Sequence, residues 1–278
     1  MFAYEDPQFL THDEIDRCLD VPRDRRVIID TDAHWGPDRR FSADSTGGIY
    51  GAKRWNALYT ELSDLILQPR LGPLPDGAEY FPYFGVGDAS PSVHPGAGGP
   101  DVQYIGNNWW RWDALRSFVT AAAAPGREIT VRGRWWDDRT CPGYREATYS
   151  DPALLAELGV SLLPSVPIGE VTTTMGTATV TPVLSRPKLS ELRMLLPRVF
   201  ETISSGSLPH FPTTMAYLLE VLPEIAPFVQ HDEDDPLVER LLHEPTRYRV
   251  AQEAAAAAAH DRFSFPTNLQ RLRELVAA

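Results

Sequence analysis

Cysteine is nearly absent from this 278-residue chain. The two that occur, Cys18 and Cys141, make neither a disulfide framework nor the spacing of a zinc site. No apolar run reaches the roughly 18 residues that a membrane-spanning helix needs. The first residues lack the basic stretch and the long apolar stretch of a signal peptide. These absences together lead us to expect a cytoplasmic protein without a transmembrane segment.

Basic residues are few compared with acidic ones. The chain has 26 Lys and Arg against 38 Asp and Glu, which gives a net charge of -12 at pH 7. Because nucleic-acid binding depends on neutralising phosphates, this balance argues against nucleic acid as a partner. A local cluster formed by Arg186, Lys188, Arg193 and Arg198 can nevertheless be positive inside an acidic protein. The hydrophobic content of 43% is that of a globular protein with a real core.

Short apolar runs alternate with helical patterns, which predicts an α/β fold with parallel sheets. Strands are expected at 25–30 (RRVIID) and 65–68 (LILQ), with a helix at 53–63 between them. The Gly- and Pro-rich stretch 85–100 predicts an interdomain linker. Beyond it we expect a strand (DVQYI), a Gly-Asn-Asn turn and a helix, then another strand (EITVRG) and a helix near 151–158. The stretch 164–188 is less regular.

The segment 185–209 is the most informative part of the chain. Pro197 suits the first position of a helix, and Gly206 suits its end. Free N–H groups and the helix dipole at such a start favour phosphate, and Arg198 adds a cation in the same turn. Glu201 lies three residues further on the same face, where its carboxylate can accept hydrogen bonds from ribose hydroxyls. The alternative is that Arg198 and Glu201 form an ordinary helix salt bridge.

This segment resembles the donor-binding half of nucleotide-sugar glycosyltransferases of the two-domain B fold. The family pattern R-x-F-E-x-x-x-x-G is matched by Arg198, Phe200, Glu201 and Gly206, and a short buried strand is expected at 207–211. Residues 243–276 resemble the closing pair of helices, with a break at 263–265. The likeness extends over most of residues 25–277. It implies two Rossmann-like domains, with residues 1–95 as a shortened acceptor-side domain, 101–262 as the donor-binding domain and 263–278 as a helix that crosses back.

The resemblance implies transfer of a hexosyl or related group from a nucleotide-activated donor to a hydroxyl-bearing acceptor. It implies no cofactor beyond that nucleotide-sugar substrate. Two departures keep an alternative open, a non-catalytic nucleotide-sugar binding or scaffold subunit. Arg193 stands where many relatives carry a second acidic residue, and only about a hundred residues precede the donor domain, whereas a complete half needs roughly 150.

Further candidates for donor binding surround the expected strand ends. Gly106, Asn107 and Asn108 follow a strand and open a helix, so that their backbone can approach a diphosphate, or they form only a tight turn. Arg111 either supplies a cation to the same phosphates or lies on a solvated face. Glu170 is a candidate replacement for the missing acid. The remaining expected donor residues are Arg186, Lys188, Arg198 and Glu201. The nearby tryptophans are expected to be mostly core.

The candidate bases lie in the first domain, directly after the strand at 25–30. An inverting transferase needs a base near the acceptor hydroxyl, and His34 and Asp32 are our candidates. Asp30 is expected to brace the loop instead, as such residues often do. An Asp-x-Asp pair also suggests a divalent metal, but it lies in the acceptor half, so we expect metal-independent transfer.

The short first domain also bears on association. A parallel sheet is normally covered on both faces, and about a hundred residues provide few helices for that purpose. An uncovered face would be an apolar patch that favours association. We therefore expect a homodimer formed through the first hundred residues.

Overall fold

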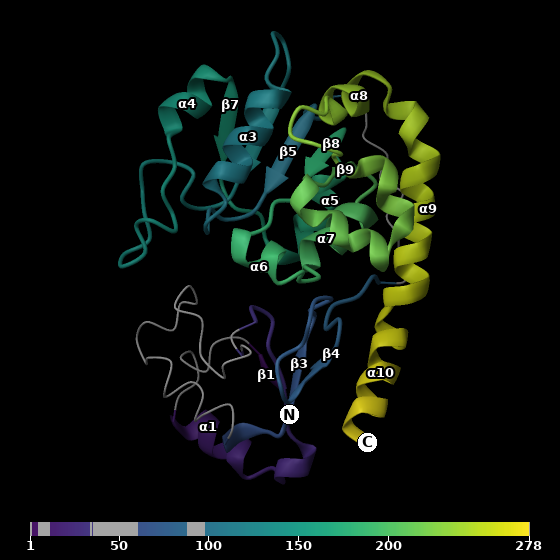
Figure 1. Ribbon diagram of the computed structural model, residues 1–278. Coiled ribbons are helices and arrows are strands. Elements are labelled where there is room, and N and C mark those ends of the chain that lie inside the picture. The colour runs from purple at the N-terminus through teal and green to yellow at the C-terminus, as the bar shows by residue number, and fades with distance from the viewer. Residues whose placement is uncertain (1, 5–11, 34, 36–60, 88–97, 278) are drawn as a thin grey trace. The chain divides into compact units, whose positions relative to one another are not determined.

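The computed structural model describes residues 2–4, 12–33, 35, 61–87 and 98–277. The chain divides into two compact units (Figure 1). Unit 1 comprises Met1–Gly85, Leu192–Leu195 and Phe263–Ala278, and unit 2 comprises Val86–Glu191 and Leu196–Arg262. One unit boundary, between Gly85 and Val86, falls at the start of the expected linker 85–100, of which residues 88–97 lie outside the described residues. The short stretch Leu192–Leu195 lies inside the range expected for the second domain, yet it belongs to unit 1.

Unit 1 contains a parallel sheet in the order β1-β2-β3-β4. Ile28 of β2 lies opposite Ile66 of β3. The strands expected at 25–30 and 65–68 are thus confirmed, whereas most of the helix expected at 53–63 lies outside the described residues. The strands are β1 (Phe2–Tyr4), β2 (Val27–Ile29), β3 (Leu65–Gln68) and β4 (Ala78–Tyr80), and the helices are α1 (His12–Leu19), the 3-10 helix η2 (Arg23–Arg25) and α10 (Phe265–Ala277).

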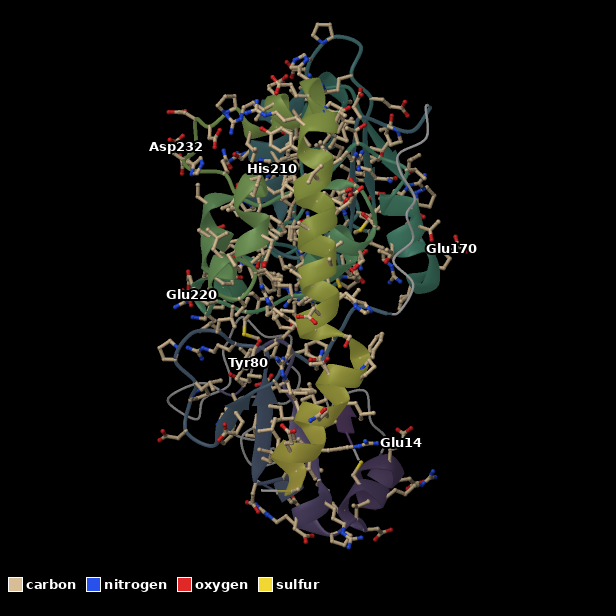
Figure 2. The ribbon with its side chains drawn as sticks, turned by 90° about the vertical axis from the view of Figure 1, so that its right-hand side faces the viewer. Glu14, Tyr80, Glu170, His210, Glu220 and Asp232 are labelled. Atoms are coloured by element: carbon tan, nitrogen blue, oxygen red, sulfur yellow. The ribbon has the colours of Figure 1, made fainter. Side chains whose placement is uncertain are left out.

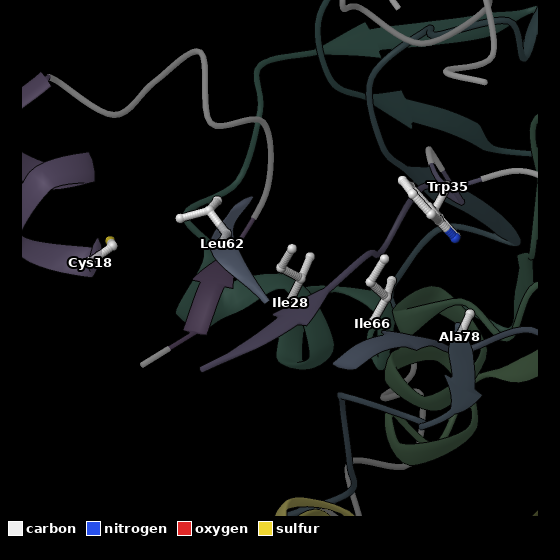
Figure 3. Packing of buried hydrophobic residues seen from close by; sticks show 6 residues of the cluster. All are labelled: Cys18, Ile28, Trp35, Leu62, Ile66 and Ala78. Carbon is white, nitrogen blue, oxygen red and sulfur yellow. The ribbon is translucent and has the colours of Figure 1, made fainter. Parts of the chain in front are cut away.

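Alternate residues of β2 and β3 enter two different hydrophobic clusters, because successive side chains of a strand point to opposite faces. On one face, Ile28 and Ile66 pack with other buried residues, which Figure 3 labels: Cys18, Trp35, Leu62 and Ala78. On the other face, Val27 and Leu67 pack with Phe81, and Leu272 and Leu275 of α10 lie against them. Both faces of these two strands are therefore covered by the chain itself.

This covering removes the basis for the expected homodimer. The prediction assumed that the first domain is too short to bury both faces of its sheet. The C-terminal helix α10 supplies the missing layer, although it lies almost two hundred residues along the chain from β3. No uncovered apolar face remains on β2 and β3 to favour association, and the homodimer is unsupported.

Unit 2 contains a parallel sheet in the order β7-β6-β5-β8-β9. It confirms the strands expected near 101–105, 128–133 and 207–211. It also contains two strands that the sequence analysis missed, β7 and β8, each only three or four residues long. The five strands are β5 (Val102–Ile105), β6 (Ile129–Arg132), β7 (Val160–Leu163), β8 (Val180–Pro182) and β9 (Leu208–His210).

Helices cover both faces of this sheet (Figure 1). Helix α3 (Trp112–Ala122) buries Leu115, Phe118, Val119 and Ala122, a spacing that forms one helical face. It packs with α8 (Leu237–His243), while α5 (Val171–Met175) and α7 (Pro197–Ser204) pack together elsewhere on the sheet. The other helices are α4 (Pro152–Glu157), α6 (Pro187–Glu191), α9 (Pro245–Phe263) and the 3-10 helices η4 (Ile168–Glu170), η5 (Thr213–Glu220) and η6 (Pro223–Phe228).

Helix α7 begins and ends where the sequence predicts. Pro197 is its first residue, and Gly206 follows its end with a φ of 83°, a conformation that glycine adopts without strain. Helix α9 fixes this end of α7, because Gln252 donates to the carbonyl of Ile203 at 2.8 Å and Arg249 donates to the carbonyl of Gly206. The closing pair of helices is also confirmed, since α9 ends at Phe263 and α10 starts at Phe265. Among the described helices, none has the length and apolar character required to cross a membrane.

Candidate functional site

The sheet of unit 2 has one point where the direction of strand addition reverses. The chain builds β5, β6 and β7 successively toward one edge, then returns to place β8 on the other side of β5. Open parallel sheets bind ligands outside the carboxyl ends of the strands at such a reversal. The segments that leave these ends are 106–111 after β5 and 183–188 after β8. They contain six of the nine expected donor-binding residues.

The backbone of the loop after β5 is already hydrogen-bonded within unit 2. The N–H groups of Gly106 and Asn108 donate to the carbonyls of Arg132 and Arg134, at 2.8 and 3.0 Å. The N–H group of Trp110 donates to the carbonyl of Ala147 at 2.6 Å. These three donors are therefore occupied in the structure. The contacts favour the tight-turn alternative over a backbone cradle for a diphosphate.

The two asparagines of this loop also have local partners. Asn107 accepts from the N–H of Arg134 at 2.9 Å. Asn108 is fully buried, and its amide donates to the carbonyls of Trp135 and Tyr149 at 3.0 and 2.6 Å. Such bonds satisfy a buried amide that would otherwise be costly. Asn108 thereby ties the loop after β5 to the segment after β6.

Two arginines connect the loops on either side of the reversal. Arg111 donates from Nε to the carbonyl of Leu184 at 3.2 Å, and from its terminal nitrogen to the carbonyl of Asn107 at 3.2 Å. The guanidinium of Arg186 lies 5.9 Å from the ring centre of Trp109, within the range of a cation–π contact. The structure therefore brings Asn107, Arg111 and Arg186 together at the carboxyl ends of β5 and β8.

An aromatic cluster adjoins these arginines. The ring of Trp109 lies 5.4 Å from those of Trp110 and Trp135, and 5.2 Å from that of Tyr144. Trp109 is 9% exposed, as expected for a core residue, and its buried indole N–H has no hydrogen-bond partner among the described residues. Trp110 and Trp135 have φ angles of 51° and 63°, which bulky residues rarely adopt. The number of tryptophans was visible in the sequence, but their convergence depends on contacts between separate loops.

The next segment of unit 2 carries the remaining basic candidates. Lys188 lies in α6 and pairs with Glu191 at 3.6 Å. Arg198 and Glu201 lie in α7, and a terminal nitrogen of Arg198 is 3.0 Å from Oε2 of Glu201. The salt bridge weighed from the sequence therefore exists in this structure. Both side chains keep a partly exposed surface, 25% for Arg198 and 32% for Glu201, so a ligand can still reach them.

Glu170 lies apart from the loops after β5 and β8. It is exposed, ends the 3-10 helix η4 and directly precedes α5, on the connection that follows β7. Figure 2 shows its side chain at the surface of unit 2. No hydrogen bond or ion pair joins it to the arginines described above, within the part of the chain that the structure describes.

The acceptor-side candidates lie after β2 in unit 1. Asp30 is buried, and its Oδ2 accepts from the N–H of Trp35 at 2.8 Å and from the amide of Gln68 at 2.7 Å. This is the bracing role expected for Asp30. Asp32 is only partly buried, in the turn that follows β2, while His34 lies outside the described residues. Within the described part of the chain, no three His, Cys, Asp or Glu residues gather in a way that could hold a metal ion.

Comparisons with known proteins identify the fold. No protein-family model matches the chain, and no curated protein matches it. Solved structures do match. Sucrose-phosphate synthase from Thermosynechococcus elongatus has a TM-score of 0.59 at 13% identity, and the match covers 90% of this chain and 67% of the synthase. Anabaena Alr3699/HepE in complex with UDP-glucose has a TM-score of 0.62 at 11% identity, and the match covers 90% of this chain and 71% of HepE.

A glycosyltransferase from Rickettsia africae has a TM-score of 0.54 at 10% identity, and the match covers 96% of this chain and 82% of that one. The match thus spans 67–82% of the length of these proteins. At these identities the likeness concerns the fold. The chain therefore has the two-domain B fold of nucleotide-sugar glycosyltransferases.

Proposed function

We propose that this chain transfers a glycosyl group from a nucleotide-activated donor to a hydroxyl-bearing acceptor. The observation that carries the proposal is the strand-order reversal of unit 2. There Arg111 contacts Leu184 and Arg186 contacts Trp109, so that each arginine links the loops after β5 and β8, and the chain continues to Lys188, Arg198 and Glu201. Open parallel α/β sheets generally bind their ligands at such a reversal, which supports a donor site there. HepE, which shares this fold, has been crystallised with UDP-glucose.

In the proposed reaction the acceptor oxygen forms a bond to the anomeric carbon while the bond from that carbon to the diphosphate oxygen breaks. The nucleoside diphosphate leaves with the electron pair, so negative charge develops on its outer phosphate. Arg186 and Lys188 would stabilise this charge, and the start of α7 with Arg198 would add to it. Such preorganised cations can do this without a divalent metal.

Glu201 is assigned to the ribose. Its Oε2 atom is held by Arg198 in this structure, which orients the carboxylate before the nucleoside arrives. Asp32 and His34 are the proposed bases that take the acceptor proton if the reaction inverts configuration. Asp30 has no such role, because its Oδ2 already accepts two hydrogen bonds in the buried loop.

The experiment measures the release of nucleoside diphosphate from a panel of UDP-, GDP- and ADP-sugars, with and without a pool of glycan and small-molecule acceptors. Acceptor-dependent release by the wild type, with a loss of at least tenfold in Arg186→Gln, would support the proposal. Arg116→Gln is the matched control, since Arg116 is an exposed arginine of α3 that pairs with Asp113 at 3.1 Å. Calorimetric binding of a nucleotide-sugar without any release would instead favour the non-catalytic subunit.

A further inference from the structure

Unit 1 contains a buried arginine that has no counter-charge among the described residues. Arg70 lies two residues beyond β3, at the carboxyl end of the sheet, and only 8% of it is exposed. Its Nε is buried without a hydrogen-bond partner, and no described carboxylate pairs with it. Burial lowers the pKa of the Arg70 guanidinium, in agreement with a cation that lacks a compensating charge. An arginine remains charged nonetheless, because its ordinary pKa lies far above neutral pH.

Such an arrangement is costly. Buried arginines are almost always paired, because taking a charge out of water without a partner costs several kcal/mol. A protein can retain an uncompensated buried cation when a ligand supplies the opposite charge. The position agrees with this explanation, since ligands of open parallel sheets bind beyond the carboxyl ends of the strands.

A second arginine is held beside the first by the segment 192–195. The N–H of Leu71 donates to the carbonyl of Arg193 at 2.9 Å, and the N–H of Leu195 donates to the carbonyl of Pro69 at 2.6 Å. These two bonds enclose an antiparallel bridge between Arg70 and Met194. Arg193 therefore sits on backbone that is directly bonded to the backbone flanking Arg70.

The contact between the two segments depends on a glycine. A Cβ at Gly72 would come within 3.1 Å of the carbonyl of Leu192 and within 3.6 Å of Cδ of Arg193. A larger residue at this position would thus push the 192–195 segment away from the end of β3. The close packing of Gly72 against the 192–195 segment therefore keeps the backbone of Arg193 next to that of Arg70.

We propose that Arg70 and Arg193 form an anion site in unit 1 that binds a carboxylate or phosphate group. The forked guanidinium of arginine matches both groups and binds them through paired hydrogen bonds. The assignment of this anionic group to the acceptor rests on the proposed function. Strand β3 neighbours β2, and the turn after β2 carries Asp32, one of the proposed bases. The acceptor is then an anionic molecule whose hydroxyl is glycosylated.

The test is direct binding to the whole 278-residue chain without any nucleotide-sugar. Thermal denaturation and calorimetry are followed with inorganic phosphate and D-glucuronate, which separate the two anions, and with D-glucose as the neutral reference. We expect saturable binding of at least one anion, weakened tenfold or more in Arg70→Gln and in Arg193→Asn. Asparagine is chosen at position 193 because it tolerates the left-handed backbone found there, with a φ of 56°. Arg25→Gln, an exposed arginine of the same unit, should bind as the wild type does.

Two further measurements test whether the anion binds at Arg70 and whether this arginine is an uncompensated charge. Arg186→Gln should keep D-glucuronate binding, because Arg186 belongs to unit 2 and to the proposed phosphate-binding donor site, so phosphate bound there is distinguished by its loss in this variant. Arg70→Met should melt at a higher temperature than the wild type when no anion is present, because it removes an uncompensated buried charge. Absence of saturable binding, equal binding in all variants, or a lower melting temperature of Arg70→Met would overturn the anion site. Failure of nucleotide-sugar turnover would leave these outcomes unchanged and would refute only the proposed transfer.

Discussion

His210 should make the stability of this protein depend on pH in a range where most carboxylates are already ionised. His210 is 6% exposed, and its ring packs edge-on against that of Phe118, with 4.9 Å between the ring centres. Its Nδ1 is buried without a hydrogen-bond partner among the described residues. Figure 2 labels it in unit 2. Burial lowers the pKa of His210 from 6.5 to about 4, and Asp235 opposes this shift only in part.

The direction of the effect follows from proton binding. Between pH 6.5 and about 4 the unfolded chain takes up a proton at this position, whereas the folded chain does not. Acidification therefore favours the unfolded state, and stability rises with pH across this window. Lowering the pKa from 6.5 to about 4 reduces the free energy of unfolding by roughly 3 kcal/mol once the pH has fallen below 4, and by about 2 kcal/mol at pH 5.

The assay is urea denaturation of the wild type and of His210→Leu at several pH values from 7.5 to 4.5. Leucine does not titrate, so the loss of stability on acidification should be smaller in the variant by about 2 kcal/mol at pH 5. The packing cost of the substitution is constant with pH and cancels from this comparison. His231→Gln, at an exposed histidine, should follow the wild-type slope. Parallel curves for wild type and His210→Leu, or an imidazole NMR signal that titrates near pH 6.5 in the folded state, would refute the reasoning.

Three other predictions concern the donor site and its loops. Glu201→Ala should weaken nucleoside diphosphate binding by about 1–3 kcal/mol in calorimetry, with little change in melting temperature, because a charged hydrogen bond to ribose is lost; unchanged affinity would remove this role. Glycosyl transfer, if measured, should persist in excess chelator, and full loss restored by magnesium or manganese would contradict the metal-free proposal. Gly133→Ala should destabilise unit 2 by more than about 2 kcal/mol, because a Cβ there meets the carbonyl of Gly106 at 2.0 Å. Gly126→Ala, which has positive φ but open space, should cost only roughly 1–2 kcal/mol, and equal losses in the two variants would be inconsistent with this clash.

The helix α7 shows how much local sequence can predict. Its start at Pro197, its end before Gly206 and the buried strand after it all follow from the conformational preferences of single residues. The pairing of Arg198 with Glu201 likewise follows from helical spacing. These features depend on residues only a few positions apart, so they are visible without knowledge of the fold.

The loop after β5 shows where local sequence fails. Gly106 and Asn108 have the composition of a phosphate-binding turn, yet their N–H groups donate to the carbonyls of the last residue of β6 and of a residue just beyond it, about 26 residues further along the chain. The strand β8 was missed for a related reason. Val180 and Thr181 favour a strand, but Pro182 argues against a central one, whereas in the fold all three residues are buried between β5 and β9. Nothing in the sequence around 180–182 indicates those neighbours.

Because α10 covers one face of the sheet of unit 1, this unit cannot complete its fold until α10 has been synthesised. The strands β2 and β3 leave the ribosome before unit 2, but Leu272 and Leu275, which cover Val27 and Leu67, are made only after unit 2 has been translated. One apolar face of the sheet of unit 1 therefore stays exposed while unit 2 is translated. Contacts between residues so distant in sequence also form slowly. A nascent chain stalled before residue 263 should bind holdase chaperones through these strands, and release of the last helix should end that dependence.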